Sequence, residues 1–322
     1  MTGENTNHHT PVLLKEVDSF LELNITNESR TKLFDGTLGG GGYSFNFLKK
    51  GWEVYSCDLD SEAISKFKYK IESEKIPLEN SHLTNSNFSK YIQEFEPNFF
   101  DGIVLDLGFS SNQLESSQRG FSYLKPDDYL DLRYDFGSLK PCWKMLYETR
   151  SAENLGKILF TYSGEELSFR IARSLISLID AKKLESELKQ DPIKVSEVVK
   201  AIEQAIPAKF RPKRNAILSR TWQALRIWTN KEFENLELFL SFSLSKLRLG
   251  GKLAVVSFHS LEDKIVTKFM RKASILMEVD DFGNKKSDYK VLTNKAVLPS
   301  PEEVSNNPRS RSAMLRVIEK KV

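Results

Sequence analysis

Short apolar runs that end in acids or glycines recur along the chain and predict β-strands. They are Lys32–Phe34, Glu53–Asp60, Asp101–Gly108, Lys252–Ser260 and Ala313–Glu319. A helix is expected to begin within Ser44–Lys50, and apolar residues at helical spacing predict helices over Ser61–Lys70 and Asn235–Leu249. Strands that alternate with helices indicate an α/β fold with a mostly parallel sheet.

The middle of the chain has a different pattern, because the strand pattern stops between about residues 112 and 215. Apolar residues there recur at helical spacing in three stretches, which start at Leu155, Leu167 and Val195. Since strands resume near Lys252, we predict a helical domain, 113–215, inserted into an α/β domain made of 1–112 and 216–322. The polar stretch 278–306 is expected to be a long surface excursion.

Composition narrows the class of protein only a little. The 322 residues are 40% hydrophobic and 28% charged, which is ordinary for a soluble globular protein, and the net charge of +3 is too small to indicate nucleic-acid binding. No secretory signal and no long apolar span is found, so a cytoplasmic protein without membrane contact is expected. The two cysteines, Cys57 and Cys142, have no metal-ligand spacing, so no metal site is expected.

A glycine-rich loop, "DGTLGGGG" from Asp35 to Gly42, follows the first predicted strand. Such a loop lets the backbone approach a phosphate, a dinucleotide or a methyl donor. A phosphate loop needs a Lys-Ser or Lys-Thr pair after the glycines, and a dinucleotide loop needs a third glycine at a fixed position. Both features are missing here. A glycine-rich turn without a ligand is the remaining structural alternative.

An acid at the end of the next strand favours the methyl donor. Asp58 stands where a carboxylate can accept hydrogen bonds from both hydroxyls of an adenosine ribose. A ligand with a ribose and no pyrophosphate fits best, and S-adenosylmethionine is such a ligand. We therefore expect Asp35, Gly36 and the later glycines of the loop to lie at a donor site, with Asp58 on the ribose.

Asp106 ends the third predicted strand, at the edge where an α/β sheet opens to its ligand. The sequence from Asp106 to Phe109 has the outline found in amino-methyltransferases, namely an acid, a tight turn and an aromatic residue. The amine of cytosine is a poor nucleophile, and a carboxylate that accepts its N–H would orient and activate it. Phe109 would stack on a flipped base. A contact to the cofactor, or a cap of the loop, is the alternative role of Asp106.

The whole chain resembles a known family, the bacterial small-subunit ribosomal RNA cytosine-N4 methyltransferases called RsmH or MraW. The matching stretches are "HTPVLLKE" (His9–Glu16), "DGTLGGGG" (Asp35–Gly42), "LDLGFSSNQL" (Leu105–Leu114), "RGFSY" (Arg119–Tyr123), "RTWQALRIWTN" (Arg220–Asn230), "GGKLAVVSFHSLEDKIVTKFM" (Gly250–Met270) and "NPRSRSAMLR" (Asn307–Arg316). "SFHSLED" and "NPRSRSA" are highly specific to this family.

This resemblance implies a class I S-adenosylmethionine-dependent methyltransferase fold, Rossmann-like, with an inserted helical domain that recognises RNA. It implies methylation of N4 of a cytidine in the decoding region of 16S rRNA in the small ribosomal subunit. The family's donor-binding positions fall here on Gly41, Gly42, Tyr43, Asp58, Phe88, Asp106 and Gln113. The oligomeric state stays open, with a homodimer as one option.

The chain departs from the family pattern at three places. Tyr43 stands where the family usually has His, the usual "GPLDMR" reads Asp128-Tyr129-Leu130-Asp131-Leu132-Arg133, and the usual "HPAT" is replaced by 216–219. These changes motivate an alternative function, a non-catalytic or altered-specificity paralogue that binds RNA or the ribosome. A methyltransferase acting on DNA or on another RNA site is a further alternative.

Two further features are candidates for the RNA side of the site. The segment 207–231 has seven basic residues and no acid: Lys209, Arg211, Lys213, Arg214, Arg220, Arg226 and Lys231. Its Trp222 and Trp228 are expected to stack on bases or to belong to the core. His259 follows a strand at the rim of the crevice and is a candidate catalytic residue at the substrate, although Ser260 and Asp263 also suggest a helix-capping box there.

Overall fold

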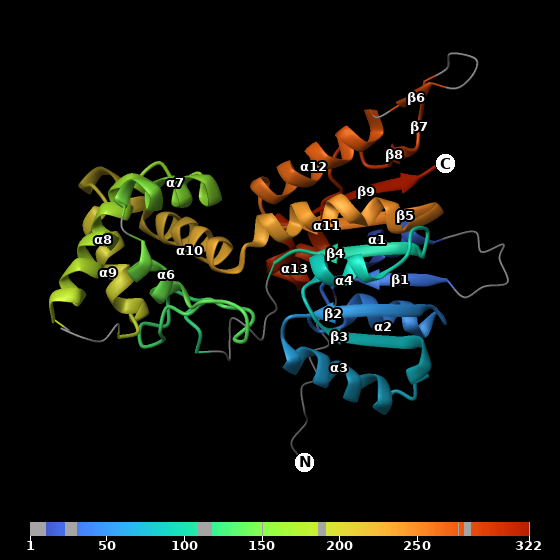
Figure 1. The fold of residues 1–322 in the computed structure, drawn as a ribbon, viewed down its shortest axis with the longest axis horizontal. Helices are drawn as coiled ribbons and strands as arrows, with labels where there is room; N and C mark the ends of the chain where they lie inside the picture. The colour runs from blue at the N-terminus through green and yellow to red at the C-terminus, as the bar shows by residue number, and fades with distance from the viewer. Residues whose placement is uncertain are drawn as a thin grey trace. The chain divides into compact units, whose positions relative to one another are not determined.

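The computed structural model describes residues 11–22, 31–108, 118–149, 151–185, 191–275, 277–279 and 285–321. The chain forms two compact units, each described here by itself (Figure 1). One consists of Met1–Gly108 with Phe233–Val322 and contains the main sheet, and the other consists of Phe109–Glu232 and is helical.

The α/β unit is built on a seven-stranded sheet. In spatial order its strands are β3 (Ser81–Asn85), β2 (Glu53–Asp58), β1 (Lys32–Asp35), β4 (Phe100–Asp106), β5 (Leu247–Ser257), β9 (Met314–Lys320) and β8 (Tyr289–Val291). The first five strands are parallel, whereas β9 and β8 are antiparallel to their neighbours. The strand order reverses direction between β1 and β4, so the carboxyl ends of these strands border the ligand crevice expected in such folds.

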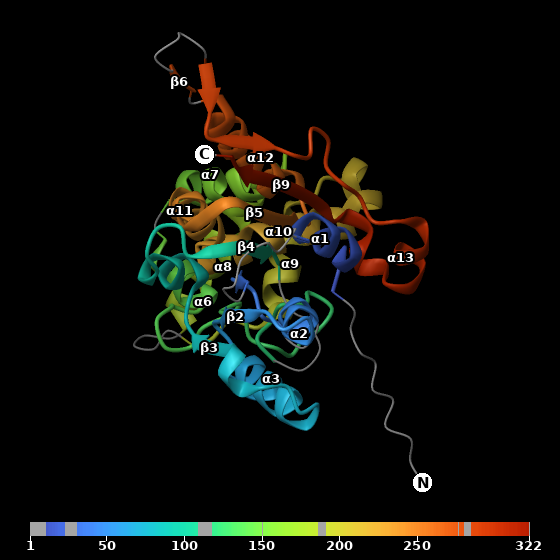
Figure 2. The ribbon, with the colours of Figure 1, turned by 90° about the vertical axis from the view of Figure 1, so that its right-hand side faces the viewer.

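Helices cover both faces of this sheet. They are α1 (Leu14–Leu21), α2 (Gly42–Lys49), α3 (Ser61–Ser73), α4 (Phe88–Tyr91), α11 (Glu232–Lys246), α12 (Ser260–Ile275) and α13 (Pro301–Asn306). Apolar residues of α1, α2 and α3 pack on one face, and those of α4, α11 and α12 pack on the other. Figure 2 shows α1 and α2 on one side of the strands and α11 on the other. Burial on both faces explains why β4 reads as a continuous apolar run.

Most predicted elements are confirmed, but the structure differs from the prediction in three ways. The helix expected to reach Leu249 ends at Lys246, and Gly250-Gly251 lie inside β5, beside an irregularity in its pairing with β4. The polar strand β3 was not predicted, because its side chains are only half buried or exposed. The stretch 278–306 includes the sheet strand β8 and helix α13, and a small hairpin is formed by β6 (Met277–Val279) and β7 (Lys285–Ser287).

The helical unit contains α6 (Cys142–Glu148), α7 (Ala152–Ser163), α8 (Ser168–Glu185), α9 (Val195–Ala205) and α10 (Arg214–Asn230). The expected boundary at residues 215 and 216 falls inside α10, and the structure places it after Glu232 instead. The reason is packing, since Ile217, Leu218, Trp222 and Leu225 of α10 are buried in the core of the helical unit. The sequence did not indicate which core this helix joins.

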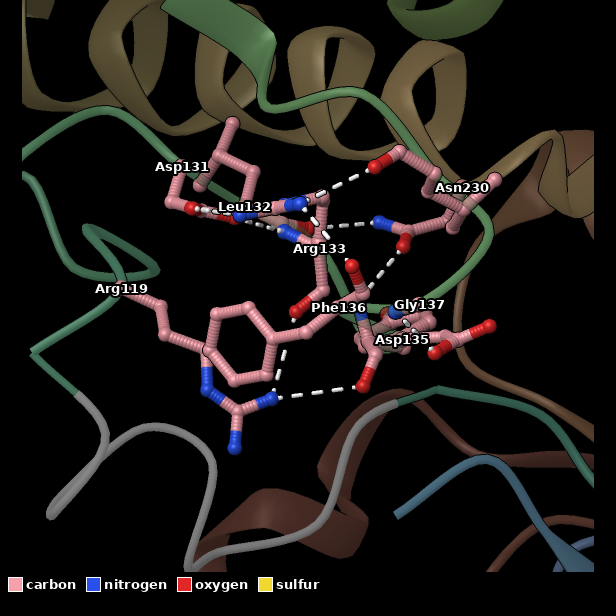
Figure 3. Close-up of polar contacts among 10 residues, drawn as sticks. Arg119, Asp131, Leu132, Arg133, Asp135, Phe136, Gly137 and Asn230 are labelled. Carbon is pink, nitrogen blue, oxygen red and sulfur yellow. Dashed lines mark hydrogen bonds and ion pairs between the residues drawn. The ribbon is translucent and has the colours of Figure 1, made fainter. Parts of the chain in front are cut away.

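Asn230, at the end of α10, holds the irregular segment that precedes α6. Its side chain is 2% exposed. The amide Nδ2 donates to the carbonyl of Leu132 at 2.7 Å and to that of Arg226 at 2.9 Å, and Oδ1 accepts the N–H of Tyr134 at 2.8 Å (Figure 3). Leu132 adopts a left-handed conformation with φ of 60°. The amide therefore provides hydrogen-bond partners for the backbone groups of a strained segment.

Replacing this amide should destabilise the helical unit. Asn230→Ala leaves backbone groups of Leu132 and Tyr134 without their buried partner, so we expect a loss of about 1–3 kcal/mol in the free energy of unfolding. Urea denaturation measures the change. The matched control is Asn215→Ala, at an exposed position of the same helix, which should stay within about 0.5 kcal/mol of the wild type. Equal stability of the two variants would contradict the role of Asn230.

Candidate functional site

The loop after β1 is fixed by a buried carboxylate. Asp35 is fully buried, and its Oδ2 accepts a hydrogen bond from Ser44 Oγ at 2.6 Å while its Oδ1 accepts the N–H of Thr37 at 3.1 Å. Burial raises the pKa of Asp35, and the hydrogen bond from Ser44 opposes this shift. Both carboxylate oxygens are engaged within the protein. Because the Asp35 side chain is fully buried, whereas that of Asp58 is only partly buried, Asp35 shapes the loop and does not offer an exposed oxygen to a ligand.

Two glycines of the loop are required by the packing of the protein itself. Gly41 has φ of 73°, and a Cβ there would lie 1.9 Å from the ring of Phe67. A Cβ on Gly42 would lie 2.3 Å from Cγ of Pro11. These glycines let α2 begin close to α3 and to the segment before α1. Their presence in the sequence is therefore explained without a ligand.

Two other glycines of the loop face open space. A Cβ on Gly40 would meet no atom within 4 Å, and one on Gly39 would meet only the Thr37 carbonyl oxygen at 3.9 Å. The loop surface available for the approach of a ligand is therefore at Gly39-Gly40. The family resemblance instead placed donor contacts at the next two glycines, Gly41 and Gly42.

Gly36 and Phe88 meet at the edge of the loop. A Cβ on Gly36 would lie 2.7 Å from Cδ1 of Leu105 and 3.0 Å from Cβ of Phe88. The Phe88 ring is half buried and packs edge-on against Phe239, with 5.4 Å between the ring centroids. Phe88 thus borders the loop and also belongs to the core. Its remaining exposed part is the candidate contact for an adenine ring.

Asp58 closes the loop from the neighbouring strand. Its Oδ2 accepts the N–H of Gly39 at 2.8 Å, and its Oδ1 accepts the N–H of Asp60 at 2.9 Å. Burial raises the pKa of Asp58 to about 6. A carboxylate has about four lone-pair positions, so the ionised group can accept two further hydrogen bonds. This arrangement suits a ligand with two adjacent hydroxyls.

The side chain of Tyr43 points into the protein interior. It is 3% exposed, and its hydroxyl donates a hydrogen bond to the carbonyl oxygen of Val12. Burial raises the pKa of Tyr43 well above its ordinary value. The tyrosine therefore ties α2 to the segment before α1. A contact of Tyr43 with a ligand would have to come from its backbone, in the first turn of α2.

Asp106 has the most unusual environment of the candidate residues. Its backbone N–H donates to Thr37 Oγ1 at 2.7 Å, which joins the end of β4 to the glycine loop. Its Oδ1 is buried and has no hydrogen-bond partner among the residues that the structure describes. Burial raises the pKa of Asp106 well above the ordinary value, and the nearby carboxylates of Asp35 and Glu262 add to the shift. A buried carboxylate oxygen without a donor is costly unless a ligand supplies one.

The candidate residues therefore converge at one edge of the sheet. Asp35, Asp58 and Asp106 end β1, β2 and β4, and hydrogen bonds link the last two to the loop between them. Gln113 and Phe109 lie outside the described residues.

The family model of the MraW methylase family matches residues 6–321. The chain belongs to this family. A similar protein is the ribosomal RNA small subunit methyltransferase H of Thermotoga neapolitana, 37% identical over 98% of this chain and 96% of the relative. The protein of the same name from Ehrlichia chaffeensis is 36% identical over 96% of this chain and 99% of the relative.

A solved rRNA methylase from Streptococcus thermophilus is also similar, with 12% identity, a TM-score of 0.39 and coverage of 98% of this chain and 99% of that one. At this TM-score the likeness adds nothing to the assignment. The class I methyltransferase fold instead follows from membership in the MraW methylase family and from the order of the seven strands.

His259, in the family motif "SFHSLED", caps a helix. Its Nδ1 accepts the N–H of Glu262 at 3.3 Å, and Glu262 Oε2 accepts the N–H of Phe258 at 2.9 Å and that of His259 at 3.4 Å. His259 Nε2 lies 2.9 Å from Glu262 Oε1. The histidine and the glutamate thus form a capping box at the start of α12.

The capping box expected from Ser260 and Asp263 is wrong. Asp263 instead forms a bidentate ion pair with Arg316 of β9, with distances of 2.8 Å to Nε and 3.0 Å to Nη2. The signal in the sequence was the three-residue spacing of His259 and Glu262. It was missed because histidine is uncommon as a helix N-cap.

The cations of the basic segment 207–231 differ in whether they form ion pairs. Acids from outside the segment 207–231 form ion pairs with three of its arginines, namely Arg214–Glu203, Arg220–Glu165 and Arg226–Glu232. Trp222 is buried, and its Nε1 donates to the carbonyl of Gly120 at 2.8 Å, so it belongs to the core. Lys209, Arg211 and Lys213 are exposed and have no ion pair within the described part of the chain.

The described residues include no group of three or more His, Cys, Asp or Glu side chains that could hold a metal ion. No helix in the same ranges has the length and apolar character needed to cross a membrane.

The contrast between the glycines predicts two different mutant phenotypes. Gly41→Ala should lower the free energy of unfolding by about 2 kcal/mol or more, because of the left-handed backbone and the contact with Phe67. Gly40→Ala should leave stability within about 0.5 kcal/mol of the wild type and weaken binding of S-adenosylmethionine. Thermal unfolding and calorimetry measure the two effects. Unchanged donor binding in a folded Gly40→Ala variant would show that the ligand does not approach there.

Proposed function

We propose that the protein is an S-adenosylmethionine-dependent methyltransferase that methylates N4 of a cytidine in the decoding region of 16S rRNA. The observation that carries this proposal is Asp106, whose buried Oδ1 lacks a hydrogen-bond donor beside the glycine loop. Membership in the MraW methylase family and the names of the relatives support the same activity. The substrate is accordingly the small ribosomal subunit or its 16S rRNA.

The residues present fit the methyl donor. Asp58 has lone pairs left to accept the two ribose hydroxyls, and Gly39-Gly40 offer an open backbone surface beside it. Phe88 borders the same loop, where its exposed part would contact the adenine. We assign Gly41, Gly42 and Tyr43 to backbone contacts only, and Asp35 to support of the loop.

Asp106 performs the orienting step in this proposal. S-adenosylmethionine, when bound, supplies a methyl group activated by a sulfonium. Asp106 accepts one N–H of the cytosine amine and holds the nitrogen lone pair in line with that methyl group. With the amine held in this way, the bound donor would transfer its methyl group from sulfur to that nitrogen, and the proton lost from the amine would pass to water. Burial raises the pKa of Asp106, which favours the protonated carboxyl group. The positive sulfonium of the bound donor would oppose this shift and favour the ionised carboxylate that this role needs.

His259 is best suited to position the substrate side of the site. Its Nδ1 accepts the N–H of Glu262, whose carboxylate is itself held by the N–H of Phe258. Its Nε2 lies 2.9 Å from Glu262 Oε1 but makes no hydrogen bond among the described residues. A ring fixed in this way keeps one orientation at the end of β5, next to β4. We propose that it shapes the rim against which the cytidine docks and does not take the amine proton.

The helical unit would supply contacts to the rRNA backbone. Lys209, Arg211 and Lys213 are exposed on the short helix 208–213 that precedes α10. Cations that form no internal ion pair can neutralise phosphates and release counterions. These three residues therefore support RNA binding better than the paired arginines of the same segment.

The alternative, a non-catalytic paralogue, is less well supported. Tyr43, one of the residues that motivated it, makes an internal hydrogen bond away from the loop surface, so the change from histidine leaves Gly39-Gly40 open. In the altered segment 216–219, Ile217 and Leu218 are core residues and the flanking two are exposed. Calorimetry with S-adenosylmethionine separates the two functions, because a non-catalytic paralogue that lost the donor would show no binding.

Methyl transfer tests the proposal directly. Small ribosomal subunits from a strain lacking the native enzyme should gain one methyl group on a cytidine N4, as measured by mass mapping of the rRNA. Asp106→Ala should lower kcat by at least about 100-fold. The same variant should keep or raise thermal stability, because it removes a buried oxygen without a partner. No transfer by the wild type at saturating donor would sink the proposed function, and full activity of the variant would remove the role of Asp106.

Donor binding should depend on pH through Asp58. Its pKa in the folded protein is raised to about 6, so the carboxylate that accepts the ribose hydroxyls is ionised above that pH and protonated below it. Affinity for S-adenosylmethionine should therefore be constant above pH 7 and weaken by roughly tenfold at pH 5. Calorimetry across this range measures the change. Asp58→Asn should bind more weakly at pH 7 and lose the pH dependence, and an unchanged profile in that variant would assign the titration to another group.

A further inference from the structure

Phe136 is an exposed aromatic residue in the segment between Gly120 and α6 of the helical unit. Its side chain is 59% exposed, although phenylalanine is among the residues most often buried. Two guanidinium groups lie against the ring, with Cζ of Arg119 at 4.7 Å and Cζ of Arg133 at 5.0 Å from its centroid (Figure 3). The ring is therefore both solvent-exposed and held by its neighbours.

The arginine at 133 is itself fixed. Its Nε and Nη2 each donate to Asp131 at 2.7 Å, and its Nη1 donates to the carbonyls of Phe136 at 3.3 Å and Leu139 at 3.0 Å. The guanidinium thus joins the beginning of the segment to its end. A side chain held by this many hydrogen bonds does not have to be ordered when a ligand binds.

The arginine at 119 is anchored to the same backbone. Its Nη1 donates to the carbonyls of Arg133 and Tyr134, both at 3.3 Å. The amide of Asn230 holds the adjoining residues Leu132 and Tyr134 from the side of α10. Phe136 therefore projects from a segment whose backbone is fixed at several points.

The charges around Phe136 are nearly balanced. Arg119 and Arg133 are matched by Asp131 and by Asp135, which accepts the N–H of Gly137 at 2.7 Å. A phosphate-binding cluster would have an excess of positive charge, as the three exposed cations at 209–213 do. The chemistry offered at Phe136 is instead that of an aromatic face supported by planar guanidinium groups.

We infer that Phe136 is a stacking site for an unpaired nucleobase of the RNA that the helical unit binds. This inference rests on the proposed function, which makes RNA the substrate, and it assigns a contact outside the donor site. Unstacked bases of single-stranded RNA are bound on aromatic side chains and on guanidinium planes, and such stacking does not need a particular base. The nearly neutral surroundings make the contact independent of counterion release.

Binding of a short unpaired RNA oligonucleotide of mixed sequence, followed by fluorescence anisotropy at several salt concentrations, tests the stacking site. Phe136→Ala should weaken binding roughly five- to 150-fold, the range measured for loss of one base–aromatic stack. The slope of log affinity against log salt should stay unchanged, because no charge is removed. Phe136→Tyr keeps an aromatic face and should retain the affinity of the wild type.

Two controls make the result decisive. Phe160→Ala removes another exposed phenylalanine of the same unit, 52% exposed on α7, and should not change RNA affinity. Lys209→Ala should lower the salt slope, since it removes a cation. Wild-type affinity in Phe136→Ala, an equal loss in Phe160→Ala, or a loss in Phe136→Ala that comes with a smaller salt slope would each overturn the stacking site.

Methyl transfer into small subunits is measured separately with the same proteins. If stacking contributes to substrate binding, Phe136→Ala should raise KM for the subunit and leave kcat close to the wild-type value. If wild-type protein binds the oligonucleotide through Phe136 and transfers no methyl group, the proposed function fails while the stacking site stands. If transfer occurs with unchanged KM in Phe136→Ala, the stacking site fails while the function stands.

Discussion

The buried hydrogen bond between Ser44 and Asp35 is the constraint on which the rest of the site depends. The same Ser44 Oγ lies 2.7 Å from Ser56 Oγ, so a short chain of buried polar groups links β1, α2 and β2. Polar groups buried at this point are stable only when they are fully paired. The pairing sets where the glycine loop leaves the sheet, and with it the positions of Gly39-Gly40 and of Asp58. The open surface and the acid beside it thus follow from an interaction in the protein interior.

Much of the α/β architecture could be predicted because its cause is local. Buried parallel strands such as β4 are continuous apolar runs, and the acids that follow them stand at one edge by topology. What could not be predicted is which atoms a side chain at each glycine position would meet. The sequence shows the same residue at positions 40 and 41, yet one faces open space and the other faces Phe67, which belongs to a helix that begins some distance along the chain. Only the packing of α3 distinguishes them.

The same reasoning applies to charge. The basic segment before and within α10 contains no acid of its own, so sequence alone assigned all its cations to RNA. In the folded chain Glu203 and Glu165, on other elements of the same unit, pair with two of the arginines. The motif at His259 was likewise identified as important, but whether a histidine caps a helix or faces a substrate depends on where Glu262 lies. Whether a cation or a histidine is available to a substrate thus depends on acids that are distant in sequence or one helical turn away.

The segment 11–13 packs against the end of the glycine loop, although more than twenty residues separate the two in the sequence. Pro11 packs where Gly42 has no side chain, and Val12 accepts the hydroxyl of Tyr43. Leu13 donates its N–H to Glu303 of α13 at 2.7 Å, so the segment also joins the loop to the C-terminal region. Truncation or fusion close to this segment is therefore a change to the donor site itself, and a loss of activity after trimming the chain there would not indicate a separate N-terminal domain.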